Sequence, residues 1–296
     1  MISDLIKKFF TTTKSDKAVV TASNLSGIPF GLIAGNGPFP FEFVRGAQAA
    51  GYCVYAVCHL GQTSPELEEE LGGVCWIRVG ELGRMIDAFS RWGVKEVAMA
   101  GGINRVSIFG GVRPDRRALA LLGRLRTTKD DIIMRGVADE LAAEGITVVS
   151  CTRFMQDSLA SEGVLTKRAP SEEQLADIEV GRQAIRAMSE QHIGQTVCVR
   201  EGVVVAVEAV EGTDAAISRG SRLGGPGTVV VKCAKTTQDM RFDVPTVGLK
   251  TLQGMKQGGA TVLALEAGRS LLLERNEVIA FADRNRMTIV GIPPLV

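Results

Sequence analysis

The residues best suited to chemistry lie between Asp239 and Pro245, where polar and apolar residues alternate. This period-two pattern predicts an extended segment with Asp239, Arg241 and Asp243 on one face. Carboxylates hold Mg²⁺, which bridges phosphate oxygens, and the charge of Arg241 or of Lys235 would offset charge on a phosphoryl group. The pattern therefore fits metal-assisted chemistry on a phosphate. The alternative is a solvent-facing edge strand with paired charges.

A second group of oxygen-bearing side chains lies between Glu208 and Asp214, in Glu208-Ala209-Val210-Glu211-Gly212-Thr213-Asp214, where a predicted strand ends and a helix begins. Two or three oxygen ligands at one turn would let Asp214 act as a further metal ligand beside Asp239 or Asp243. Glu211, Gly212 and Thr213 would then lie near the substrate. The alternative is a helix N-cap with acidic neighbours.

Two glycine-rich turns offer backbone groups instead of side chains. Gly35-Asn36-Gly37 follows the first predicted strand, and Gly101-Gly102 follows the fourth. Turns at the carboxyl edge of a parallel sheet present N–H groups to an anion, so we expect a phosphate group there. The dinucleotide fingerprint is missing, because Pro40 stands where its third glycine should be and no acidic residue closes the second strand. A plain tight turn is the alternative.

Asp130 and Asp131 open a predicted helix over residues 130–144. They either cap that helix or face a cleft as a pair of carboxylates that binds substrate. The motifs of several other enzyme classes are missing from the sequence. It has no G-x-S-x-G or H-E-x-x-H motif of hydrolases and no P-loop of NTPases, and it contains two histidines. His59 beside Cys58 is interpreted as structural, the alternative being an active thiol pair.

Short apolar runs alternate with helical segments from residue 30 onward. Strands are predicted at 31–35, 53–57, 74–77, 97–100 and 146–149, with helices over 39–50, 81–92 and 130–144. This alternation predicts a parallel sheet covered on both faces, so residues 30–158 are expected to form a Rossmann-like domain. Residues 1–29 fit neither domain and are assigned to an N-terminal extension.

The regular pattern of predicted strands and helices is interrupted over residues 159–170, which we predict to be a linker. Residues 171–296 are expected to form a second α/β domain with a mixed sheet, which would be the catalytic domain. Its predicted elements are a helix opened by Ser171, a hairpin of strands 196–200 and 203–207, strands at 229–233, 262–265 and 271–273, and helices near 214–222, 246–257 and 276–285. The predicted fold class is α/β with two domains.

The composition narrows the classes of partner and location. Thirty-four Lys and Arg residues against 33 Asp and Glu residues give a net charge of +1, which argues against nucleic acid as a partner. No apolar run approaches the roughly 20 residues that cross a bilayer. The six cysteines include no C-x-x-C pair, as expected of reduced thiols. We therefore expect a soluble, cytoplasmic protein.

These stretches together resemble the LpxI family of UDP-2,3-diacylglucosamine pyrophosphatases. The matching segments are 31–37, Lys129-Asp130-Asp131, Ile193-Gly194-Gln195, 205–214 with its Glu-Gly-Thr-Asp, and 241–248 with its Arg-x-Asp-x-Pro-Thr-x-Gly. The last two motifs in this order are specific to the family, whereas the glycine turn alone is not.

The resemblance implies two α/β domains with substrate between them, a homodimer, and Mg²⁺-dependent cleavage of UDP-2,3-diacylglucosamine to UMP and 2,3-diacylglucosamine 1-phosphate in lipid A synthesis. Water would attack the uridine-linked phosphorus. The essential aspartate of the family falls on Asp243, as metal ligand or water activator. Because this substrate carries two acyl chains, we also expect transient contact with the surface of the inner membrane.

Two other function classes fit parts of the sequence. The opening strand and turn would suit a nicotinamide-dependent oxidoreductase, although the missing third glycine and acidic residue count against it. The acidic groups would also suit a non-catalytic nucleotide sensor in which they only cap helices. Turnover of a UDP-sugar lipid separates an enzyme from such a sensor.

Overall fold

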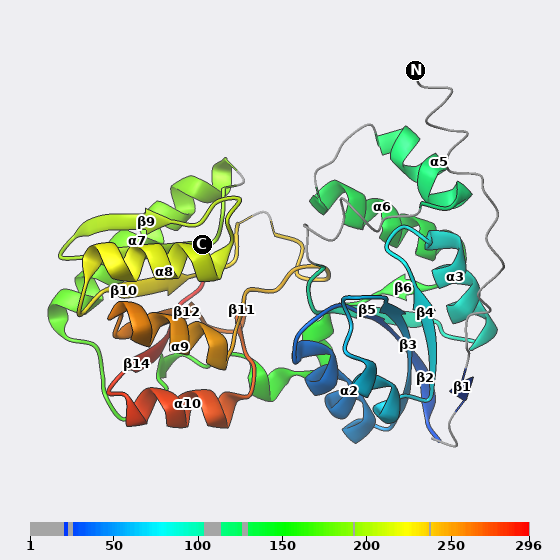
Figure 1. Cartoon of the computed structure of the whole chain (residues 1–296), viewed down its shortest axis with the longest axis horizontal. Helices are drawn as coiled ribbons and strands as arrows, with labels where there is room; N and C mark the ends of the chain where they lie inside the picture. Colours follow the sequence, from blue (N-terminus) through cyan, green and yellow to red (C-terminus); the bar gives the residue numbers. More distant parts are fainter. Residues whose placement is uncertain are drawn as a thin grey trace.

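The apolar runs in the first half of the chain form a six-stranded sheet (Figure 1). The computed structural model describes residues 21–22, 26–103, 114–125, 130–191, 193–236 and 238–295, so most of the N-terminal extension lies outside it. The strand order is β1 (Thr21–Ala22), β4 (Gly73–Ile77), β3 (Tyr52–His59), β2 (Ile28–Ala34), β5 (Glu96–Ala100) and β6 (Thr147–Val148). All neighbouring strands are parallel except β1, which pairs antiparallel with β4.

This order reverses direction between β2 and β5, which makes their carboxyl ends the switch point where ligands of open α/β sheets bind. Helix α2 (Phe39–Ala49) packs on one face of the sheet. Helices α3 (Leu82–Arg91), α5 (Arg116–Leu125) and α6 (Asp130–Ala143) pack on the other. Helix α5 was not predicted from the sequence. Short 3₁₀ helices follow at Pro65–Glu70, Cys151–Phe154 and Gln156–Ser158.

The second half of the chain forms a mixed six-stranded sheet. Its order is β7 (Gly163–Val164), β14 (Thr288–Ile292), β12 (Val262–Glu266), β10 (Val229–Lys232), β8 (Thr196–Arg200) and β9 (Val203–Val207). Helix α7 (Glu172–Glu190) covers one face, and α8 (Thr213–Gly224), α9 (Leu249–Gly258) and α10 (Arg275–Arg284) cover the other. Together the two sheets confirm the predicted α/β class.

Local sequence signals explain several of these elements. The predicted hairpin forms between β8 and β9, and both turn residues, Glu201 and Gly202, have positive φ angles. Ser171 caps α7 through a reciprocal capping box with Gln174. Two expectations were incomplete: residues 163–164, placed in a linker, form an edge strand of the second sheet, and β14 was not predicted.

The segment from Asp239 to Asp243 does not form the extended strand that the alternation predicted. The amide groups of Phe242 and Asp243 both donate to the carbonyl oxygen of Asp239, at 3.0 and 3.3 Å, so the chain turns here. The apolar residues alternate for another reason. Met240 packs against the core on the α2 face of the first sheet, and Phe242 packs against the core on the opposite face.

This turn joins the two halves of the molecule. Ser150, which follows β6, donates a hydrogen bond of 3.1 Å to the carbonyl oxygen of Met240. Beyond the turn, a two-stranded sheet of β11 (Thr246–Val247) and β13 (Leu271–Leu272) forms, and Leu271 is buried in the same core cluster as Phe43 of α2. The second half of the chain is therefore anchored at the carboxyl edge of the first sheet.

Candidate active site at the carboxyl edges of the two sheets

The two predicted glycine turns meet at the switch point of the first sheet. Asn36 donates its amide hydrogen to the carbonyl oxygen of Gly102 at 2.8 Å, and Gly35 donates to Ala100 at 2.8 Å. A Cβ atom on Gly35 would lie 2.5 Å from the oxygen of Gly102, and one on Gly101 would lie 2.5 Å from the oxygen of Asn36. Both glycines are thus required by the close approach of backbone to backbone.

The third residue of the first turn has a different environment. Gly37 has a φ of 82°, and no other group lies within 4 Å of the position of its missing Cβ. Helix α2 then begins without a side-chain cap. Because Pro38 and Pro40 carry no N–H group, the amides of Gly37 and Phe39 are the donors that this helix start can offer an anion.

A cavity of about 610 Å³ opens beside this turn. Its lining comes from both halves of the chain: Gly37, Pro38, Phe41, Glu42, Arg45, Gln62, Ser64 and, from the second half, Glu274. A smaller cavity of about 320 Å³ lies between α9 and α10, and none of the predicted site residues lines it. The larger cavity is therefore the one placed to receive part of a ligand at the glycine turn.

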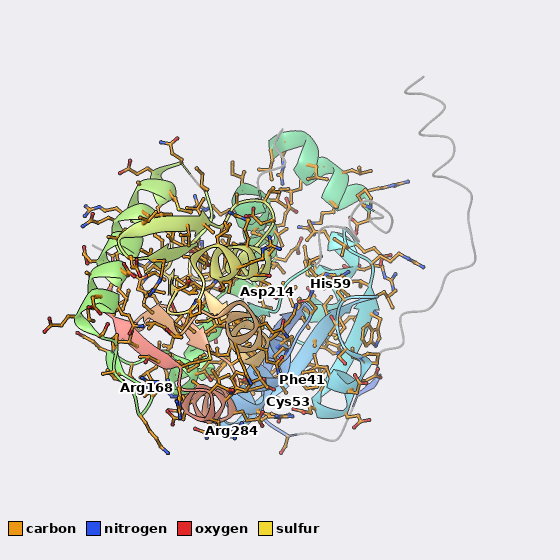
Figure 2. All side chains as sticks on the ribbon, turned by 60° about the vertical axis from the view of Figure 1, so that its left-hand side comes forward. Phe41, Cys53, His59, Arg168, Asp214 and Arg284 are labelled. Atoms are coloured by element: carbon orange, nitrogen blue, oxygen red, sulfur yellow. The ribbon has the colours of Figure 1, made fainter. Side chains whose placement is uncertain are left out.

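His59, whose position Figure 2 shows, ends strand β3 at the same edge, and Cys58 precedes it in the strand. The Nδ1 of His59 donates to the carbonyl oxygen of Ala34 at 2.9 Å, and burial lowers the pKa of the ring, so the imidazole is held neutral. Burial raises the pKa of the Cys58 thiol to about 12. A thiol with that pKa stays protonated, which supports the structural interpretation of the pair.

Asp243 lies where the two halves of the chain meet. Its carboxylate is exposed to solvent and accepts a hydrogen bond of 2.7 Å from the Nε2 of Gln238. Desolvation by the surrounding protein nevertheless raises its pKa, while the charges of Lys232 and Lys235 lower it. Its own charge adds to the burial that raises the pKa of Cys151, a residue of the first half. Asp243 is thus reachable from solvent and closely surrounded by groups from both halves.

Three polar residues at the carboxyl edge of the second sheet lie beside Asp243. Lys232 ends β10, Glu208 follows β9, and both influence the pKa of the Asp243 carboxyl. Thr213 connects them, since its Oγ1 donates to Glu208 at 2.8 Å and accepts from Lys232 at 2.8 Å. Sequence reasoning missed Lys232 and gave Glu208 no separate role. The sequence feature that could have identified Lys232 is a lysine at the end of an otherwise apolar strand.

Other predicted site residues are already engaged in ion pairs. The guanidinium of Arg241 binds both carboxylate oxygens of Asp239, at 3.0 and 2.7 Å, and lies 4.8 Å from the ring centre of Phe242. This pairing, aided by Arg135 at 3.9 Å, lowers the pKa of Asp239. Asp239 and Arg241 therefore neutralise each other on the side of the turn that faces α6.

The acidic residues at the turn before α8 also form ion pairs. Asp214 pairs with Lys250 at 2.8 Å, and Glu211 pairs with Arg219 at 2.5 Å. Gly212 supplies the positive φ of 83° from which the helix starts. In the first half, α6 begins at Asp130, but the side chains of Asp130 and Asp131 lie outside the described residues.

The predicted metal ligands Asp243, Asp239 and Asp214 are not brought into one group. Within the described ranges, no set of three His, Cys, Asp or Glu side chains is arranged to hold a metal ion. Asp243 alone of the three forms no ion pair with a described cation. One such carboxylate still suits Mg²⁺, which typically binds one or two protein carboxylates together with water and substrate phosphates.

Both halves of the chain match models of one protein family. A family model described as the LpxI N-terminal domain matches residues 29–158, and one described as the LpxI C-terminal domain matches residues 161–290. "UDP-2,3-diacylglucosamine pyrophosphatase LpxI" of Caulobacter vibrioides is 34% identical over 280 residues, covering 89% of this chain and 97% of that protein.

The solved structure that matches this chain resembles it only weakly. A murein peptide ligase from Psychrobacter arcticus matches with a TM-score of 0.27 and 12% identity, over 90% of this chain and 53% of that chain. In the described part of this chain, no helix has the length and apolar character needed to cross a membrane. The two family models and the extent of the Caulobacter match show that the chain belongs to the LpxI family.

Proposed function

We propose that this protein hydrolyses the pyrophosphate bond of UDP-2,3-diacylglucosamine to UMP and 2,3-diacylglucosamine 1-phosphate, a step of lipid A synthesis. The Caulobacter relative is named as a pyrophosphatase of this substrate. The observation in this chain that supports the proposal is Asp243, a solvent-accessible carboxylate between the carboxyl edges of two sheets, with Lys232 and Lys235 close enough to affect its pKa.

In the proposed reaction, a water molecule forms a bond to the uridine-linked phosphorus. The bond from that phosphorus to the bridging oxygen breaks, and its electron pair leaves on the phosphate of the sugar while one water proton is lost to solvent. Asp243 orients the water and the reacting phosphate. Lys235 offsets the negative charge that builds up on the phosphoryl oxygens.

Mg²⁺ is the proposed cofactor. Asp243 and oxygens of the substrate's pyrophosphate would hold it. When bound, it would supply a water of lowered pKa and neutralise phosphate charge. Asp214 and Asp239 are secondary candidates for metal ligands. Asp214 would first have to leave its ion pair with Lys250, and Asp239 its ion pair with Arg241.

The nucleotide and its pyrophosphate are placed at the turns of Gly35–Gly37 and Gly101–Gly102, with Asp130 and Asp131 at the start of α6 and Thr213 at the start of α8 as further contacts. In this arrangement the substrate lies between the two halves of the chain. A homodimer, a cytoplasmic location and transient contact with anionic membrane surfaces complete the proposal. Sedimentation and flotation with substrate-bearing vesicles test the contact with membrane surfaces.

Substitution of Asp243 tests the proposal directly. Asp243→Asn is expected to lower kcat by about 100-fold or more, while Asp87→Asn, at an exposed carboxylate of α3, leaves it unchanged. Removal of divalent metal with EDTA should abolish wild-type turnover, and Mg²⁺ should restore it. In ¹⁸O-labelled water the label is expected in UMP. Near-normal hydrolysis by Asp243→Asn, or label in the sugar phosphate, contradicts the assignment.

A further inference from the structure

Lys232 is a buried lysine at the carboxyl end of β10, and its exposed fraction is 2%. The preceding strand residues, Val229 to Val231, are fully buried apolar side chains. Desolvation at this position lowers the pKa of the ammonium group, because burial disfavours its charged form. A charged group in such a place is rare unless it binds a partner of opposite charge.

The hydrogen bonds of Lys232 leave part of its donor capacity unused. Its Nζ donates to Oγ1 of Thr213 at 2.8 Å and to Oγ1 of Thr196 at 3.4 Å. Both acceptors are neutral hydroxyl groups. An ammonium group has three N–H donors, so one donor has no acceptor among the described residues.

Carboxylates surround Lys232 without touching it. The charges of Glu208, Asp243 and Asp214 raise its pKa against the effect of burial, yet no described carboxylate forms an ion pair with its Nζ. Arg241 and Lys250 differ, because each contacts its own aspartate at 2.7 or 2.8 Å. In its ionised form Lys232 therefore has an N–H group and a charge that no described carboxylate binds directly, at a position fixed by two threonines.

We propose that Lys232 is a catalytic residue that donates its remaining N–H to a phosphoryl oxygen of the substrate's pyrophosphate beside Asp243. This inference rests on the proposed hydrolase function and deepens it. Lys232 loses no proton in the step. It stabilises the charge on the phosphoryl oxygens while water adds to phosphorus and the anhydride P–O bond breaks.

The first experiment measures binding of three probes, uridine, UMP and UDP, by isothermal titration calorimetry. Lys232→Met is expected to weaken UDP binding by about 10- to 100-fold, the effect of losing one charged hydrogen bond, and to leave uridine binding unchanged. Lys95→Met, at an exposed lysine that precedes β5 in the first half of the chain, serves as the matched control and should bind all three probes normally.

The second experiment measures turnover. Lys232→Met should lower kcat by about 100-fold, and Lys232→Arg should recover part of the loss because it keeps the charge. If the methionine variant is unstable, Lys232→Gln provides the same comparison, since its amide still offers donors to the two threonines. Melting curves of all variants accompany both experiments.

The proposal is overturned if Lys232→Met, or Lys232→Gln where that replaces it, binds UDP within threefold of the wild type. It is also overturned if uridine and UDP affinities fall by the same factor, because a merely structural lysine would act on both. Failure of the proposed hydrolase function has a separate signature. In that case the wild-type protein does not cleave UDP-2,3-diacylglucosamine, and the comparison of UDP with uridine still decides whether Lys232 binds phosphate.

Discussion

The carboxylate of Glu42 joins α2 to the start of α10, because its Oε1 accepts the backbone N–H of Glu274 at 2.5 Å. Its other oxygen accepts a hydrogen bond of 3.1 Å from Ser158. Glu274 has a φ of 51°, an uncommon conformation for a residue other than glycine. One side chain thus holds together parts of the chain that are 232 positions apart, beside the 610 Å³ cavity that it also lines.

Loss of this contact is expected to weaken the junction between the two halves. Glu42→Ala should reduce the free energy of unfolding by about 1–3 kcal/mol, because the N–H of Glu274 loses a charged acceptor. Glu69→Ala, at an exposed glutamate of the first half, is the control and should change it by less than about 0.5 kcal/mol. Urea denaturation measures both. Equal effects of the two substitutions would show that Glu42 does not stabilise the junction.

The ion pair of Asp239 and Arg241 predicts coupled effects on activity. Since the guanidinium binds both oxygens of the carboxylate, either Asp239→Asn or Arg241→Gln disrupts the turn that carries Asp243. We expect each to lower kcat/KM by a similar factor of about ten, and the double variant to lower it no further. Steady-state kinetics of the three variants provide the measurement. Additive losses would mean that Arg241 contacts the substrate independently, as the sequence alone suggested.

Gly35 is expected to tolerate no side chain. Gly35→Ala places a methyl group 2.5 Å from the carbonyl oxygen of Gly102 and should destabilise the fold by about 1–3 kcal/mol. The matched control is Gly254→Ala within α9, where no atom lies within 4 Å of the added carbon. That change should stabilise the protein by about 0.5–1 kcal/mol through higher helix propensity. Thermal melting that ranks the two variants the other way would contradict the geometry at the switch point.

His59 predicts a pH dependence of stability. Burial holds its pKa in the folded protein below that of the unfolded chain, which is about 6.5. As the pH falls through that value, the unfolded chain binds a proton and the folded protein does not. The stability contributed by neutral His59 is therefore present above about pH 6.5 and declines as the pH falls toward the folded pKa.

His59→Asn removes this titration and keeps a side-chain donor for the carbonyl oxygen of Ala34. Its free energy of unfolding should fall less between about pH 7.5 and about pH 5.5 than that of the wild type. Denaturant titrations at several pH values measure the two slopes, and His192 is present in both proteins. Identical slopes would show that the imidazole of His59 titrates in the folded protein as it does in the unfolded chain.

The sequence by itself determined the α/β class and most of the elements that carry the site. Apolar runs of four to eight residues and periodic helices are local patterns, so they predicted β2 to β5, α7 and the hairpin at Glu201-Gly202. The glycine turns were predicted at one sheet edge because the carboxyl ends of parallel strands meet there. Asp243 was found through the family resemblance, and no pattern of spacing could have separated it from Asp239.

Tertiary structure alone decided which charges are free. The alternation from Asp239 to Asp243 is a local pattern that predicts a strand. The chain turns instead, because this places Met240 and Phe242 against the cores on opposite faces of the first sheet, where their apolar surface is removed from water. The same long-range packing brings Lys232 to Thr213 without an ion pair to any described carboxylate, whereas Arg241 forms an ion pair with its neighbour Asp239. The contacts of Lys232, Met240 and Phe242 depend on distances between separate segments of the chain, and composition or periodicity carries no information about those distances.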